Sequence, residues 1–178
     1  MVKYLYLFVF FFWYFMTETL NFTQQFILFL HNPILLSCIF SWLGAQFIKA
    51  AINLIYGRIH SIAELFEVML WRTGGMPSSH SSLVTSLCVS IGFRNGLQSD
   101  LFIFSLCFFL VVIRDAFGVR RSSGIQAKKL NEIGNELKDK KIIENYKGLK
   151  EVDGHTPMEV LCGCLFGFFV ALSFCLLK

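Results

Sequence analysis

The stretch GGMPSSHSS, residues 74–82, lies between apolar segments and is the point around which the rest of the chain is organised. Its glycines allow a sharp turn and a close approach of the backbone to a ligand. Pro77 is predicted in the first turn of a helix, where its missing N–H costs nothing. The serines and His80 then lie at a helix N-terminus, which attracts anions. The stretch predicts either a phosphate cradle with a proton-transferring histidine or a Gly-Pro turn with serine caps.

Composition indicates a membrane protein. The chain has 178 residues, of which 55% are hydrophobic, and this is more apolar surface than a soluble domain of its length can bury. We predict an all-α fold, a multi-pass transmembrane helical bundle of about four to five spans. All six cysteines lie in apolar runs and are expected to be small buried hydrophobes. No metal site, cofactor or nucleic-acid partner is predicted, and the sequence does not indicate an oligomeric state.

Apolar runs predict spans at residues 4–20, 34–56, 78–93, 99–117 and 157–177. The fourth is expected to end where charged residues and Gly118 follow it. The first run is either a retained span or a signal peptide, and the absence of a small-residue cleavage site favours the retained span.

Two regions follow from these runs. Residues 1–33 form an N-terminal apolar segment, a first span followed by an interfacial stretch, and residues 34–178 form the main membrane domain. Lys49 lies within a predicted span, where it either snorkels to the headgroups or marks a functional site.

The segment between the last two spans is polar and basic. Nine basic residues and five acidic ones lie between positions 120 and 151, and Leu130, Ile133 and Leu137 recur at helical spacing. An amphipathic helix with this charge is expected to bind anionic headgroups, and the positive-inside rule places it on the cytoplasmic side. The same topology brings Lys49, His80, Arg120 and His155 to that membrane face.

A second histidine opens the last predicted span. Thr156 and Glu159 fit a capping box, with Pro157 at the first helical position. His155 therefore lies at a helix N-terminus, and Glu159 can receive its ring N–H. A histidine oriented by a carboxylate can serve as a nucleophile or general base. Two such histidines beside cations on one membrane face suit phosphoryl transfer.

These residues resemble the three-part signature of the type 2 phosphatidic acid phosphatase superfamily, which also contains vanadium haloperoxidases. The matching features are Lys49 with Arg58, then residues 77–80, then His155 with Glu159. The chain is most similar to the divergent membrane branch of that superfamily. This closer resemblance spans residues 34–177 and is carried by residues 74–82, 114–121, 126–131 and 154–157.

The resemblance implies a metal-independent lipid phosphate phosphatase. His155 would attack phosphorus and form a phosphohistidine, His80 would protonate the leaving oxygen, and Glu159 would orient His155. The phosphate oxygens would be held by Lys49, Arg58, Ser78, Ser79, Arg120 and Arg121. The implied substrate is a membrane lipid phosphate such as phosphatidate, phosphatidylglycerophosphate or an isoprenyl phosphate.

One departure from the superfamily pattern keeps a second function open. Leu149 stands six residues before His155, where the third motif carries an arginine. The alternative function is a non-catalytic membrane scaffold that binds anionic lipid through the basic segment.

Overall fold

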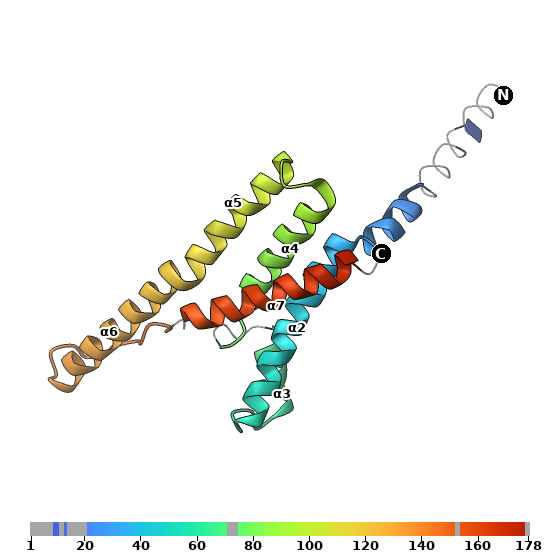
Figure 1. The fold of residues 1–178 in the computed structure, drawn as a ribbon. Helices are drawn as coiled ribbons and strands as arrows, with labels where there is room; N and C mark the ends of the chain where they lie inside the picture. The colour runs from blue at the N-terminus through green and yellow to red at the C-terminus, as the bar shows by residue number, and fades with distance from the viewer. Residues whose placement is uncertain (1–8, 11–12, 14–20, 71–74, 152–153, 177–178) are drawn as a thin grey trace, which may run out of the picture.

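A computed structural model describes residues 9–10, 13, 21–70, 75–151 and 154–176 (Figure 1). These residues are helical and contain no β-strand, which confirms the all-α prediction. A short helix covers residues 21–30. The elements that follow are α2 (Pro33–Ile55), α3 (Ile62–Leu70), α4 (Ser79–Asn95), α5 (Asp100–Arg114), the π-helical turn η1 (Asp115–Val119), α6 (Arg120–Asp139) and α7 (Pro157–Leu176).

Helices α2, α4, α5 and α7 form a bundle in which α4 is the central helix, in contact with the other three (Figure 1). Glycines bring α7 close to α4. A Cβ at Gly163 would meet the carbonyl oxygen of Ser78, and one at Gly167 would meet that of Ser82. Small residues at a contact let two helix backbones approach closely, as is common in membrane bundles. This contact fixes the start of α7 against the start of α4.

Serine pairs join α2 to α4. Ser37 Oγ lies 2.8 Å from Ser90 Oγ, and Ser41 Oγ lies 2.5 Å from Ser82 Oγ. All four side chains are buried, so each hydroxyl group finds its partner inside the bundle rather than in solvent. The serines that interrupt the apolar pattern of residues 81–93 therefore face the protein interior.

Within the described residues, two helices, α2 with 23 residues and α7 with 20, are long and apolar enough to cross a membrane. Helices α4 and α5 coincide with the spans predicted at residues 78–93 and 99–117, but with 17 and 15 residues they are shorter than α2 and α7. The count of about four to five spans thus stays a prediction. The first predicted span, residues 4–20, falls almost entirely outside the described residues.

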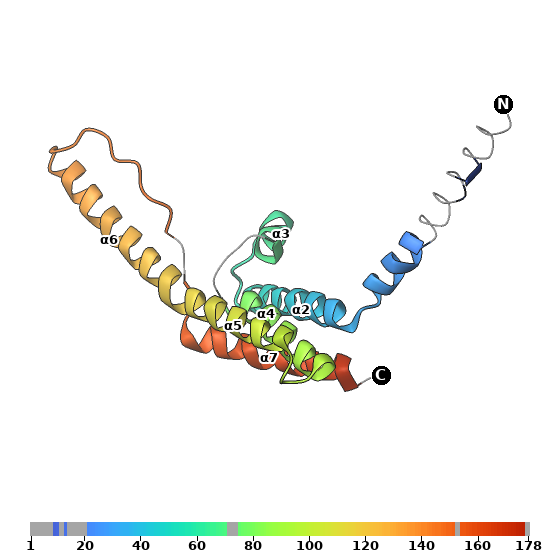
Figure 2. The same ribbon diagram turned by 90° about the horizontal axis from the view of Figure 1, so that it is seen from above.

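Two local predictions are wrong. Pro77 does not open the helix, because Ser78 is the N-cap and accepts the N–H of Ser81 at 3.4 Å. The cysteines are not all buried: Cys88 is, but Cys107 faces outward, since the outer surface of this bundle is itself apolar. Helix α5 ends at Arg114, where the charged residues begin, and η1 carries the helical path onward into α6 without a break (Figure 2).

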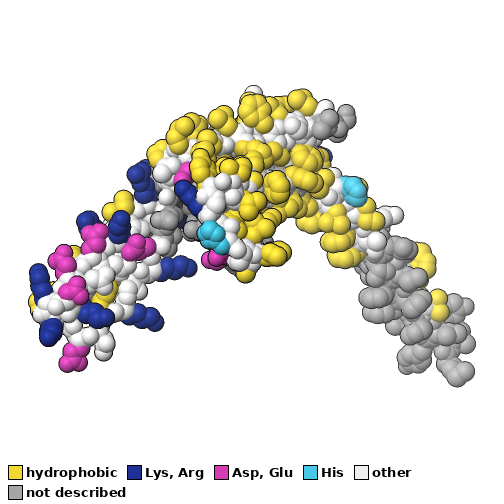
Figure 3. Space-filling view, turned by 90° about the horizontal axis from the view of Figure 1, so that it is seen from below, with side chains coloured by type: hydrophobic (Ala, Val, Ile, Leu, Met, Phe, Trp, Pro, Cys, Tyr) yellow, Lys and Arg dark blue, Asp and Glu magenta, His cyan; other side chains and the backbone are white. Residues whose placement is uncertain are grey.

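Helix α6 leaves the bundle with its 20 residues and spans about 30 Å. We call α6 and the chain that returns along it, residues 120–151, the arm (Figure 2). Charged side chains gather along the arm, whereas the visible face of the bundle is mostly hydrophobic (Figure 3). The amphipathic helix predicted here is confirmed, and Leu130 and Ile133 on it are exposed.

Asn131 fastens the returning chain to α6. Its Oδ1 accepts hydrogen bonds from the Tyr146 hydroxyl and the Leu149 N–H, both at 2.7 Å, and its Nδ2 donates to the Leu149 carbonyl at 2.9 Å. The Tyr146 ring lies directly over Gly134, where a Cβ would clash with it. These contacts direct the chain back toward the bundle, where α7 begins.

Candidate active site

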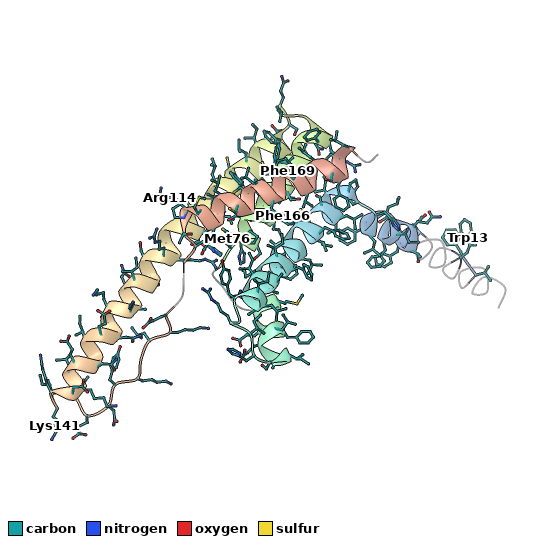
Figure 4. All side chains as sticks on the ribbon, turned by 60° about the horizontal axis from the view of Figure 1, so that its bottom comes forward. Trp13, Met76, Arg114, Lys141, Phe166 and Phe169 are labelled. Atoms are coloured by element: carbon teal, nitrogen blue, oxygen red, sulfur yellow. The ribbon has the colours of Figure 1, made fainter. Side chains whose placement is uncertain are left out.

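Both histidines singled out in the sequence meet at the end of the bundle where the arm begins. They line one small cavity, the histidine cavity, whose walls are His80, Val112, Asp115, Ala116, Arg120 and His155. Figure 4 shows Met76 and Arg114 at this end of the bundle and Lys141 at the far tip of the arm. The cavity combines groups from the starts of α4, η1 and α6 and from the end of α5 with His155, which lies just before α7.

His155 is held at both its backbone and its ring. Its N–H donates to the carbonyl of Ala116 in η1 at 3.2 Å, and its Nδ1 lies 3.0 Å from Glu159 Oε2. The same carboxylate oxygen accepts the Thr156 N–H at 3.1 Å, while the Glu159 N–H donates to Thr156 Oγ1 at 3.3 Å. The predicted capping box is therefore confirmed. With Nδ1 facing Glu159, the lone pair of an imidazole protonated there is on Nε2.

His155 is 6% exposed, and its charge state follows from that burial. Burial lowers the pKa of His155, and the Glu159 carboxylate opposes this effect only in part, while Lys49 and Arg120 add to it. The imidazole is thus neutral around pH 7, which is the form that has a free lone pair.

His80 lies in the first turn of α4 and is exposed at the cavity. Ser78 and Ser79 beside it are buried. Ser78 Oγ caps the helix and accepts the Ser81 hydroxyl at 2.9 Å, whereas the N–H groups of Ser79 and His80 belong to the first turn, where no intrahelical acceptor exists. An anion at this position would meet those N–H groups and the positive end of the helix dipole.

Lys49 does not snorkel to the surface. The residue is 2% exposed. The turn at Gly75, where φ is +83°, lies against the aliphatic part of its side chain, since a Cβ added at Gly75 would be 3.6 Å from Lys49 Cγ. Its charge acts electrostatically on Glu159, His80 and His155. A buried ammonium is a costly arrangement unless an anion balances it.

The two other predicted arginines lie away from the cavity walls. The Arg58 guanidinium is exposed and lies 5.4 Å from the centre of the Tyr56 ring. Arg121 contributes its backbone, which Gly154 approaches so closely that a Cβ there would clash, while its side chain is exposed. Of the arginines considered in the sequence, Arg120 is the one that lines the cavity.

Asp115 is the cavity residue that the sequence interpretation missed. Its Oδ2 accepts a hydrogen bond from Arg120 Nε at 2.6 Å. The available signal was an acidic residue at the end of an apolar run, five positions before an arginine. Across the described part of the chain, no group of three or more His, Cys, Asp or Glu side chains is arranged to hold a metal ion.

Comparison with known proteins identifies the family of the chain. The Divergent PAP2 family matches residues 30–170, and the chain belongs to that family. The chain is also similar to the uncharacterized membrane protein YuiD of Bacillus subtilis (strain 168). The two are 39% identical over 153 residues, which cover 80% of this chain and 94% of that protein. The chain is accordingly a membrane protein of the divergent PAP2 family. No solved structure matches it.

Proposed function

We propose that the protein is an integral-membrane phosphatase that hydrolyses a lipid phosphate monoester through a phosphohistidine intermediate. One observation supports this most strongly: His155, oriented by Glu159, shares a cavity with His80 and Arg120, while Lys49 is buried in α2 and its charge acts on both histidines. Nucleophile, proton donor and cations are the parts that phosphoryl transfer requires.

In the proposed mechanism, Nε2 of neutral His155 attacks phosphorus, and the bond from phosphorus to the lipid oxygen breaks. Protonated His80 gives its proton to that oxygen, and the lipid alcohol leaves. Water then attacks the phosphohistidine while His80 accepts a proton from it, and the bond between phosphorus and nitrogen breaks to release phosphate. Glu159 stabilises the positive charge that His155 gains while the phosphoryl group is attached.

The phosphate oxygens need positive partners in the transition state, where charge spreads over them. Lys49, the Arg120 guanidinium and the free N–H groups at the start of α4 are suitable. In the superfamily's third motif an arginine stands where this chain has Leu149. The Arg120 guanidinium would take the role of that arginine. The Leu149 backbone is bound to Asn131 on the arm, so that position is remote from this chemistry.

The proposal extends to topology. Four helices, α2, α4, α5 and α7, would cross the bilayer, together with a fifth span near the N-terminus. The basic arm and the histidine cavity would then lie on the cytoplasmic side. Trypsin added to sealed inverted vesicles should cleave within residues 120–151. In sealed right-side-out vesicles, residues 120–151 should be protected from trypsin. The reverse protection would invert the assignment.

Phosphate release tests the chemistry. The purified protein in detergent micelles would be given phosphatidate, phosphatidylglycerophosphate and isoprenyl phosphate with EDTA present. We expect release by the wild type and loss of more than about 10³-fold in His155→Ala, with a loss of about 10² to 10⁴-fold in His80→Ala. His60→Ala, an exposed histidine outside the cavity, should retain wild-type activity.

Trapping distinguishes the covalent mechanism from direct attack by water. With a radiolabelled phosphate monoester, rapid quenching should leave label on the wild type that is stable in alkali and lost in acid. The label should be absent from His155→Ala. Full turnover by His155→Ala would exclude the mechanism.

The arm favours a second candidate, a non-catalytic scaffold that binds anionic lipid. Its nine basic residues and its exposed Leu130 and Ile133 suit a negatively charged membrane surface. This function predicts binding to anionic liposomes that weakens with added salt. A folded wild type that binds such liposomes and releases no phosphate from any lipid would establish it in place of the phosphatase.

A further inference from the structure

Asp115 is a cavity residue to which the proposed mechanism gives no task. It shares the histidine cavity with His80, Arg120 and His155. Its side chain is 38% exposed, so solvent could satisfy it without a protein partner. Its carboxylate nevertheless lies against Arg120 rather than turning outward.

The π-helical turn explains how these two side chains meet. In η1 the N–H of Arg120 bonds to the carbonyl of Asp115, five residues earlier. Residues at this spacing share one side of a π-turn, whereas an α-helix would rotate them well apart. The contact between Nε and Oδ2 occupies the inner donor of the guanidinium. The two terminal amino groups remain as the donors available to a phosphate.

Asp115 also affects the charge balance around His80. The walls of the histidine cavity that surround His80 include Arg120, which is cationic, and His155, which can become so. Asp115 is the acidic residue among those walls. Opposite charges attract, so its carboxylate stabilises the protonated imidazole that a general acid must have.

We propose that Asp115 is a positioning residue of this active site. Its carboxylate holds Arg120 so that the outer edge of the guanidinium faces the substrate phosphate, and its charge supports the protonated form of His80. The proposal rests on the proposed phosphatase function. It also explains the π-turn, since this local change of helical register brings the aspartate and the arginine together.

A double-mutant cycle tests the contact with Arg120. Asp115→Asn should raise KM by about tenfold, because Arg120 then loses its charged partner. In an Arg120→Ala background, the same change should alter KM less than about threefold. Arg120→Lys, which keeps the charge but lacks the fork of donors, should reproduce the KM rise. Asp100→Asn, in the first turn of α5 away from the cavity, is the matched control.

The pH profile tests the electrostatic effect of Asp115 on His80 separately. Activity should fall at alkaline pH when His80 loses its proton, and Asp115→Asn should move this alkaline limb to lower pH. The shift should persist in the Arg120→Ala background, because it does not depend on the guanidinium. If the role of Asp115 were purely structural, Asp115→Asn would lower the yield of folded protein. The folded fraction would keep the wild-type KM and the wild-type alkaline limb of the pH profile.

Each outcome bears on the proposal. Equal KM and equal alkaline limbs in wild type and Asp115→Asn would overturn it and leave the phosphatase standing. An equal KM rise with and without Arg120 would overturn the positioning role. Absence of phosphate release by folded wild type would overturn the proposed function and this inference together. If Asp115→Asn does not fold, a wild-type KM in Arg120→Lys overturns the positioning role.

Discussion

Charged side chains have opposite environments in the bundle and on the arm. In the bundle, Lys49 is buried, and its charge is felt by His80 and His155. On the arm, Lys129 bonds Glu132 at 2.7 Å, with both side chains largely in solvent. Charge repeated along an exposed helix favours solvation and attraction to surfaces, whereas one charge inside an apolar bundle must have a specific counterpart.

This difference indicates where the candidate catalytic groups are concentrated. The arm holds many more ionisable groups, yet the cavity lies at the junction where the arm enters the bundle. Of the groups at this junction, Lys49 and His155 are buried, which removes competing water and strengthens their electrostatic interactions. The predictions below test this division of roles.

The largest contrast is expected between two lysines. Lys49→Met should lower kcat/KM by about 10² to 10³-fold, as does the loss of a preorganised partner of transition-state charge. Lys129→Met on the arm should change it less than about twofold. Phosphate release by both variants, with circular dichroism to confirm folding, makes the comparison. Equal losses would show that Lys49 acts by general charge rather than by position.

The next effect concerns His155. Glu159→Gln should lower kcat by about 10 to 100-fold, because a hydrogen bond to a charged group is worth about 1.5–3 kcal/mol. Burial lowers the pKa of His155 and Glu159 partly opposes that, so removing the carboxylate charge lowers it further. Since His155 must be neutral to attack, the acid limb of the pH profile should move to lower pH. A limb that moves upward would contradict this assignment.

Glycine substitutions compare packing in the two regions. Gly167→Ala should destabilise the bundle by about 1–3 kcal/mol, since its Cβ would meet backbone atoms of α4 that cannot move aside. Gly118→Ala has its nearest neighbouring atom at 4.0 Å and is the matched control. Thermal unfolding in detergent measures both. Equal midpoints would show that α4 and α7 are less closely packed than described.

On the arm, Asn131→Ala should loosen the returning chain without weakening the bundle. It removes hydrogen bonds of about 0.5–1.5 kcal/mol each to Tyr146 and to the backbone of Leu149. Amide exchange should increase in residues 140–151, while the unfolding midpoint of the bundle stays constant. Asn145→Ala in the same segment serves as the control. A lower midpoint in Asn131→Ala would show that the arm and bundle unfold as one unit.

The smallest effect is expected for the surface ion pair. Glu132→Gln breaks its contact with Lys129, and we expect no measurable change in the unfolding midpoint. Thermal unfolding at low and high salt provides the check. A salt-dependent loss of stability would show that the charges of the arm form a network.

Much of this arrangement could be predicted from local patterns. The apolar runs located α2, α4, α5 and α7, and alternating the direction of successive spans placed His80 and His155 at one end. The capping box at Thr156 and Glu159 was predictable because its partners are three residues apart. Each of these inferences needs only helical periodicity and the order of the helices.

The remainder depends on contacts that periodicity does not encode. Asp115 reaches Arg120 through a π-turn, a change of hydrogen-bond register that no apolar pattern reports. Pro77 was wrongly predicted in the first turn of the helix, because Ser78 is the N-cap and α4 begins only after it. Arg58 and Arg120 look equivalent as cations after spans, and only the tertiary packing separates the one beside Tyr56 from the one in the cavity.

The unbroken path from α5 through η1 into α6 limits how such a chain can change in length. Each residue advances a helix by about 100°, so a single insertion between Arg120 and Asn131 would swing Asn131 away from the returning chain. Insertions of about seven or eleven residues nearly restore the direction. Loops, in contrast, tolerate insertions of any number of residues. Natural variation in arm length should therefore occur in whole-turn steps along α6 and freely at its tip.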